Sequence, residues 1–442
     1  MFHDAIILLG GLAAVAGLSL AFFSQRYWFA RAWRFAGRMR KPKWRSALHT
    51  ALLAMLVSVV LIALASVVST WRGTVSHGSW WTPFFGLWLS SSIFSYLFIK
   101  IVAGAEWFWG CLRPAHSPAK NGPAASATRA ETIDHSRRYF FQTAGFLAGA
   151  VPFVSAAYGF AAERLRFQVS EVEIPVAHLP AALDGMRITQ LSDIHIGSYM
   201  PLAQVRRAVG MANELGGDLV VVTGDFLTGR GDPLEDCISE LSQLRSPLGV
   251  WGCNGNHEIY ADAEARAAAL FQRFGMKLLR RENAELRWQG SAFNLIGVDY
   301  QRQRDTNGSR APMLLGLEPL VRRDVPNILL SHNPNSFPRA AELGIELSLA
   351  GHTHGGQVRV EILDHRWSPA EFLTPYVAGV YQRPLRASSR LNDAEIAAKS
   401  PISSLTRSAI SSIYVNRGLG TIGAPVRLGV PPEITLLTLR RA

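Results

Sequence analysis

This sequence of 442 residues has few cysteines and few charged residues. Its three cysteines are Cys111, Cys237 and Cys253, and their spacing is that of neither a zinc site nor a disulfide framework. Charged residues make up 18% of the chain and hydrophobic residues 48%, a high apolar content for a wholly soluble enzyme. The apolar excess lies before residue 163, so we expect a membrane portion followed by a globular portion.

Acidic residues are absent from residues 24–45, where eight Lys and Arg residues lie between two apolar runs. A net charge of +12 can indicate a nucleic-acid partner, but much of it is concentrated in this short stretch. Basic residues beside membrane segments favour the cytoplasmic side of a bilayer. We therefore interpret residues 24–45 as a basic cytoplasmic loop and expect no nucleic acid as a partner.

Three uncharged runs, at residues 5–24, 51–70 and 80–99, are long enough to cross a bilayer as helices. They define a transmembrane region over residues 1–112. Residues 113–135, rich in Pro, Gly, Ala and Ser, are typical of a linker.

Residues 136–162 begin with Ser-Arg-Arg and continue as an uncharged apolar run. This pattern fits either a fourth membrane segment or a twin-arginine-like signal anchor, which a peptidase could remove. Both interpretations place residues 163–442 outside the cytoplasm. We expect an integral protein of the inner (cytoplasmic) membrane with an extracytoplasmic domain.

Residues 163–442 alternate short apolar runs with helical stretches, as an α/β domain does. The expected strands are residues 186–191, 218–223, 249–253, 293–298, 327–330, 347–350, 412–415 and 433–439. Expected helices are residues 202–215, 233–244 and 261–274. Residues 384–408, rich in Arg, Ser, Ala and Asn, are expected to form a mobile insertion, with a substrate-contacting lid as the alternative.

Polar motifs follow five of the expected strands, where open α/β sheets place their sites. They are Asp193-Ile194-His195, Gly224-Asp225, Gly255-Asn256-His257-Glu258, Ser331-His332 and Gly351-His352-Thr353-His354-Gly355-Gly356. Singly, each could be a helix cap, a turn, a loop or a satisfied buried histidine. Residues two apart in an extended segment point to the same side, so His352 and His354 can face one pocket. Together the motifs offer carboxylate, amide and imidazole donors, which suit Mn, Fe, Zn or Co better than Mg or Ca.

These five blocks, in this order, resemble those of the calcineurin-like metallophosphoesterase superfamily. The resemblance covers about residues 186–440. Within the superfamily, the sequence most resembles a membrane-attached or exported bacterial branch, on the basis of residues 191–195, 351–357 and 414–420. It implies an α/β fold, a four-layer sandwich of two mixed β-sheets flanked by helices. Here an α-helical transmembrane region precedes that domain.

The resemblance also implies two divalent metal ions. Asp193, His195, Asp225 and His354 would hold one ion, and Asp225 would bridge to a second held also by Asn256, His332 and His352. His257 would stabilise the developing charge or protonate the leaving group, and Glu258 would orient His257 or tune its charge.

These roles imply a membrane-anchored phosphoesterase that hydrolyses phosphodiester or pyrophosphate bonds by a hydroxide activated at the dinuclear centre. The wide apolar region favours an alternative, a lipid-directed pyrophosphatase or phosphodiesterase acting on nucleotide-linked lipids or phospholipid head groups. A non-enzymatic, metal-dependent binding module is a third interpretation. A binding module of this kind would have lost some of the metal ligands, and none of them is missing from this sequence.

Overall fold

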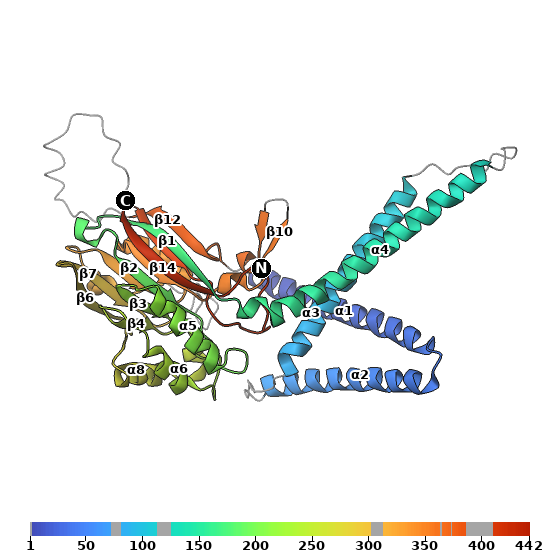
Figure 1. Cartoon of the computed structure of the whole chain (residues 1–442), viewed down its shortest axis with the longest axis horizontal. Coiled ribbons are helices and arrows are strands. Elements are labelled where there is room, and N and C mark those ends of the chain that lie inside the picture. Colours follow the sequence, from blue (N-terminus) through green and yellow to red (C-terminus); the bar gives the residue numbers. More distant parts are fainter. Residues whose placement is uncertain are drawn as a thin grey trace. The chain divides into compact units, whose positions relative to one another are not determined.

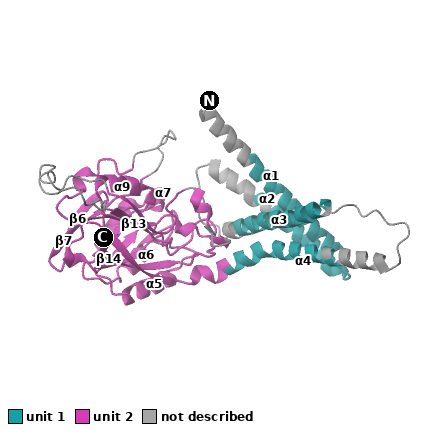
Figure 2. Ribbon diagram, turned by 90° about the horizontal axis from the view of Figure 1, so that it is seen from above, with its two compact units in different colours: residues 1–158 teal, residues 159–442 magenta. Residues whose placement is uncertain are grey.

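The computed structural model describes residues 2–71, 81–112, 125–301, 313–362, 365–372, 374–385 and 410–442. The chain divides into two compact units, residues 1–158 and 159–442, which are coloured separately in Figure 2. Most of the expected insertion at residues 384–408 lies outside the described residues, as does the first part of the expected linker.

Unit 1 consists of long helices. They are α1 (Phe2–Gly37), α2 (Pro42–Trp71), α3 (Trp81–Cys111) and α4 (Ala125–Ala161), the last of which continues into unit 2. Each expected membrane segment lies on one of these helices. Of the expected basic loop at residues 24–45, only residues 38–41 lie outside α1 and α2. Helix α4 begins at Ala125, inside the expected linker.

Two stretches in the described part of the chain are long and apolar enough to cross a membrane, Phe85–Trp109 and Arg138–Leu165. Buried serines join the helices of unit 1. Gln25 Nε2 donates to Ser92 Oγ at 2.6 Å, and Ser95 Oγ donates to the Gly149 carbonyl at 2.5 Å. Small and hydroxylated residues between close-packed helices are typical of helix contacts in lipid.

Unit 2 contains two six-stranded mixed sheets (Figure 1). The first has the order β1 (Gln168–Val176), β14 (Glu433–Arg441), β2 (Arg187–Leu191), β3 (Leu219–Thr223), β4 (Val250–Cys253) and β5 (Lys277–Leu278). The second has the order β12 (Gly379–Pro384), β13 (Ile410–Val415), β9 (Leu347–Ala350), β8 (Asn327–Leu330), β7 (Ser291–Gly297) and β6 (Glu282–Trp288). Strands β2 to β5 run parallel, as do β7, β8, β9 and β13.

The core lies between the sheets. Ile188, Val221 and Trp251 of the first sheet and Leu295 and Leu349 of the second belong to one buried apolar cluster. The helices α5 (Leu202–Glu214), α6 (Leu234–Leu241) and α8 (Glu264–Arg273) contribute to a second cluster with β3. Helix α9 (Phe337–Leu343) contributes Ala340 to a third with β7 and β8. Two mixed sheets flanked by helices confirm the expected fold class.

All eight expected strands are present, with ends within two residues of those expected. Strands β1, β5, β6 and β12 were not expected, because they are edge strands with partly exposed side chains and weak or short apolar runs. Helices α7 (Asn256–Ala261) and α9 and the short hairpin of β10 (Val360–Ile362) with β11 (His365–Trp367) also went unexpected. Each is too short to show a clear period.

Candidate metal centre

The candidate ligands follow the carboxyl ends of five strands. Asp193 and His195 follow β2, Asp225 follows β3, and Asn256 opens helix α7 just after β4. His332 follows β8 of the second sheet, and the His352 to His354 segment follows β9. Parallel strands end at the same edge of a sheet, so each sheet delivers its polar loops to one place.

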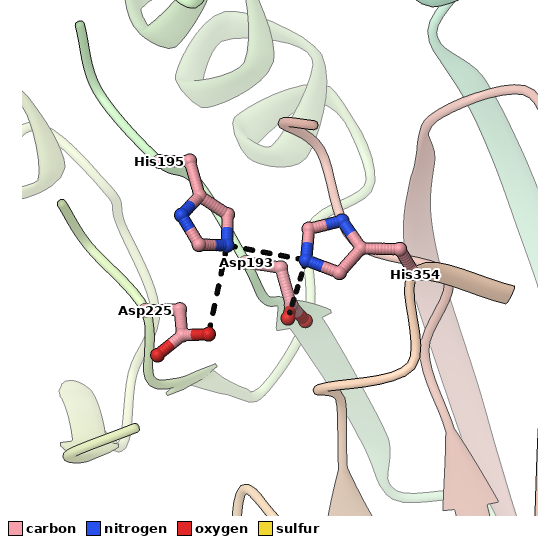
Figure 3. A group of neighbouring side chains, drawn as sticks. All are labelled: Asp193, His195, Asp225 and His354. Atoms are coloured by element: carbon pink, nitrogen blue, oxygen red, sulfur yellow. Dashed lines mark hydrogen bonds and ion pairs between the residues drawn. The ribbon is translucent and has the colours of Figure 1, made fainter. Parts of the chain in front are cut away.

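The first group of ligands comprises Asp193, His195, Asp225 and His354, whose donor atoms all lie within 4.8 Å of one another (Figure 3). His195 Nε2 lies 3.1 Å from His354 Nε2 and 3.5 Å from Asp225 Oδ2. His354 Nε2 lies 3.3 Å from Asp193 Oδ1. These side chains are buried, so one cation could contact all four.

The second group comprises Asp225, His332 and His352. His332 Nε2 lies 3.0 Å from Asp225 Oδ2, the same oxygen that faces His195. Asn256 Oδ1 is buried and has no hydrogen-bond partner among the described residues. An orphaned buried oxygen is costly, and a cation would satisfy it. The donor set therefore fits divalent metal ions, with Asp225 common to both groups.

Backbone strain is concentrated at these ligands. Asp193, His195, Asp225, His352 and His354 all have φ between 50° and 74°, in the left-handed region that non-glycine residues rarely adopt. Each such conformation costs about 1–3 kcal/mol and persists only where the surroundings impose it. The fold therefore holds these side chains in position at the expense of stability.

Two glycines let the ligand loops approach one another. A Cβ added at Gly351 would lie 2.0 Å from Ser192 Oγ and 2.2 Å from Asp193 Oδ2. One added at Gly255 would lie 2.1 Å from Asp225 Oδ1. Any larger residue at either position would displace an aspartate of the first group.

Burial keeps three of the imidazoles neutral. It lowers the pKa of His195 to about 3 and that of His352 to about 4, and it holds the pKa of His354 well below its usual range. A neutral imidazole has a lone pair available for a metal ion. Binding at these histidines therefore needs no proton release above about pH 5.

The field of the aspartates favours positive charge between them. Burial alone would lower the pKa of His332, but Asp225 and Asp193 raise it to about 10. Burial would raise the pKa of Asp225, but His332 and His195 hold it well below its usual range. The interactions that favour a proton on His332 would equally favour a divalent cation there.

His257 and Glu258 both contact the loop that carries Asp225 or the residues just after it. His257 Nδ1 lies 2.6 Å from the Thr228 carbonyl oxygen, which orients the ring, and the backbone N–H of His257 donates to Asp225 Oδ1 at 2.9 Å. Glu258 accepts from the backbone N–H groups of Asp225, Phe226 and Gly255 at 2.7–2.9 Å. These three donors fix the Glu258 carboxylate on the Asp225 loop, and its expected role toward His257 stays a prediction.

Several supporting residues carried no clear signal in the sequence. Arg427 is fully buried, donates from Nε to the Gly420 carbonyl at 3.0 Å, and places Nη2 3.5 Å from His354 Nδ1. Tyr300 has its ring 5.4 Å from that of His352. The one available hint was an arginine within the apolar stretch 424–431, since a buried arginine must have partners.

Comparison with known proteins gives a consistent result. The family model described as calcineurin-like phosphoesterase matches residues 186–356. A Danio rerio protein described as "transmembrane protein with metallophosphoesterase domain" is 30% identical over 381 residues, which is 83% of this chain and 78% of the relative. An uncharacterized metallophosphoesterase of Bacillus subtilis, YkuE, is 27% identical over 69% of this chain and 98% of its own length.

A third relative is the phosphodiesterase YaeI of Escherichia coli, 25% identical over 57% of this chain and 82% of its own length. The relatives thus come from an animal as well as from bacteria, so the expected bacterial branch fits only in part. The apolar helices and a relative described as a transmembrane protein both indicate membrane association.

Proposed function

Because this chain belongs to the calcineurin-like phosphoesterase family, we propose that it is a membrane-anchored hydrolase of phosphodiester or pyrophosphate bonds with a dinuclear metal centre. The observation that carries this proposal is the pair of ligand groups that share Asp225. A carboxylate common to both groups can bridge two neighbouring cations.

The proposed ligands form two sets. Asp193, His195, Asp225 and His354 would hold the first cation, and Asp225, Asn256, His332 and His352 the second. Mn, Fe, Zn or Co suits this mixture of oxygen and imidazole donors. When bound, the two ions would polarise the phosphoryl group and lower the pKa of a water molecule.

His257 would act at the leaving oxygen. Its Nδ1 donates to the Thr228 carbonyl, which leaves Nε2 as the atom that can carry or release a proton. The His257 and His195 rings lie 4.7 Å apart, so His257 borders the first ligand group. Glu258, held by three backbone N–H groups, would position Asp225 without touching the substrate.

Asp225→Asn tests this function, with Asp236→Asn as a matched control at an exposed position of helix α6. Both variants make the same chemical change in the full chain, purified in detergent and supplied with Mn²⁺. We expect D225N to lose hydrolysis of bis(p-nitrophenyl) phosphate by at least about a hundredfold, since a bridging charge is removed, and D236N to keep it. Equal activity of D225N and the wild type would contradict the assignment.

We further propose that the protein resides in the inner membrane with its catalytic domain outside the cytoplasm. The basic residues between α1 and α2 support this orientation. We also propose that residues 136–161, which lie on helix α4, are retained as a fourth membrane segment. A carboxyl-terminal reporter active only outside the cytoplasm should work. A signal from a fusion that fluoresces only inside would reverse the orientation and favour cytoplasmic substrates.

A further inference from the structure

The β10–β11 hairpin exposes apolar side chains. Together with the adjoining 3₁₀ turn η6 (Pro369–Phe372) it carries Val360, Trp367 and Phe372, which are 39%, 46% and 80% exposed. The Trp367 and Phe372 rings pack edge to face, with centroids 6.0 Å apart. In Figure 1 the hairpin, labelled β10, stands out from the sheets of unit 2. Grouped exposed apolar residues on a protruding element mark a contact surface.

This surface adjoins the candidate metal centre. The turn η5 (His354–Gly356) leads into the hairpin after three residues. A Cβ added at Gly356 would lie 1.8 Å from Ser368 Oγ and 3.3 Å from Ala370 Cβ, so η6 packs directly on the ligand loop. The exposed aromatics therefore lie on elements that adjoin or pack against the segment that carries His352 and His354.

The base of the hairpin also lies close to the end of the apolar stretch Arg138–Leu165. Arg359 N donates to the Leu428 carbonyl at 2.8 Å, and the preceding Arg427 N donates to the Gly159 carbonyl at 3.3 Å. A Cβ added at Gly159 would lie 2.5 Å from the Arg427 carbonyl oxygen. One short segment, residues 427–428, thus contacts both the hairpin and the last turns of a helix suited to a membrane.

We infer that the hairpin and η6 form a membrane-contact element that rests in the interfacial layer of a lipid bilayer through Val360, Trp367 and Phe372. If the helix ending near Leu165 crosses the bilayer, the residues it contacts at Gly159 lie near the bilayer surface, and the hairpin base lies with them. Tryptophan is favoured in this layer, where its ring is partly buried and partly hydrated. A protein partner or a second copy of this chain is less favoured, because neither explains the proximity to the helix end.

The lipid contact, taken together with the proposed hydrolase function on which this step rests, indicates the class of substrate. A bilayer held against η6 would present phosphate groups of lipids to the ligand loop that η6 packs on. The substrate class would be a lipid with a phosphodiester or pyrophosphate head group.

A fluorescent probe tests the lipid contact directly. In the full chain with C111S, which removes the exposed cysteine and leaves the buried Cys237 and Cys253, F372C is labelled with NBD and reconstituted into phosphatidylcholine and phosphatidylglycerol vesicles. The matched control is L315C, at a leucine that is 67% exposed on another loop of unit 2. We expect spin-labelled lipids to quench the probe at residue 372 and not at 315.

Equal exposure of both probes to aqueous iodide would overturn the lipid contact. Protection of residue 372 from both iodide and spin-labelled lipid would also overturn it, because a protein would then cover the hairpin.

A kinetic experiment tests the substrate class. The combined variant V360S/W367S/F372S and the control L315S are compared in vesicles on hexadecyl p-nitrophenyl phosphate and on soluble bis(p-nitrophenyl) phosphate. We expect the combined variant to lose about tenfold in kcat/KM on the lipid ester only, because three apolar contacts with the bilayer are removed. Equal losses on both esters, or none, would refute the substrate part. Failure of the wild type to cleave either ester would instead contradict the proposed hydrolase and leave the probe result standing.

Discussion

Gly255→Ala should disable the metal centre by steric displacement of one carboxylate. Gly255 has φ −96° and ψ −169°, a conformation that alanine adopts without strain, so the effect of the substitution comes from the added Cβ. The added Cβ would lie 2.1 Å from Asp225 Oδ1 and 2.6 Å from the Asp225 backbone nitrogen. Ordinary contact begins near 3.4 Å, so the carboxylate oxygen must move by about 1.3 Å and the Asp225 backbone must shift as well.

A displacement of this size is large for a bridging ligand, because misplacement by 1 Å can lower a rate about a hundredfold. We therefore expect G255A to lose about a hundredfold in kcat/KM on bis(p-nitrophenyl) phosphate and to bind less than the wild-type amount of metal by mass spectrometry. The control is G210A in helix α5, where the new methyl group meets nothing within 4 Å. Wild-type metal content and rate in G255A would refute the proposed position of Asp225 in the centre.

Three further predictions concern His257, Arg427 and Glu433. H257Q should keep its metals and lower kcat about a hundredfold, since proton transfer contributes that order of rate; metal loss would make His257 a ligand. R427M should weaken metal binding, because it strips the buried Gly420 carbonyl of its donor and the N–H of Gly420 holds the Asp193 carbonyl; unchanged affinity would contradict this. E433Q should destabilise the chain by about 3 kcal/mol, measured by thermal unfolding in detergent, because Glu433 is paired with Arg417. Burial would raise the pKa of Glu433, but Arg417 holds this pKa below its ordinary value. The ion pair therefore stabilises the fold above the ordinary pKa of a glutamate, and this stabilisation is lost as the pH falls through the lower pKa of the folded state. The stability of E433Q should not show this decrease at low pH.

The sequence was sufficient to predict the candidate ligands because they occupy regular positions. Each follows a buried strand, and strands β2, β3, β4, β8 and β9 are short, fully apolar runs that are easily recognised. Parallel pairing then brings the loops after these strands to one edge.

Contacts between distant segments could not be predicted in this way. No local pattern indicates that Glu258 accepts hydrogen bonds from the Asp225 loop, 33 residues away in the sequence. Its position next to His257 suits a partner of that histidine equally well. The contact between Arg427 Nη2 and His354 Nδ1 likewise joins residues that are 73 positions apart in the sequence. The hairpin with Trp367 was missed for a different reason, since three-residue strands show no periodicity.

The most direct test of the dinuclear centre is electron paramagnetic resonance of the full chain loaded with Mn²⁺. The two ligand groups that share Asp225 predict a spectrum of two exchange-coupled ions per chain. In D225N, which lacks the bridging charge, the coupling should be lost together with hydrolysis. A wild-type chain that is fully active with one uncoupled ion would contradict the account.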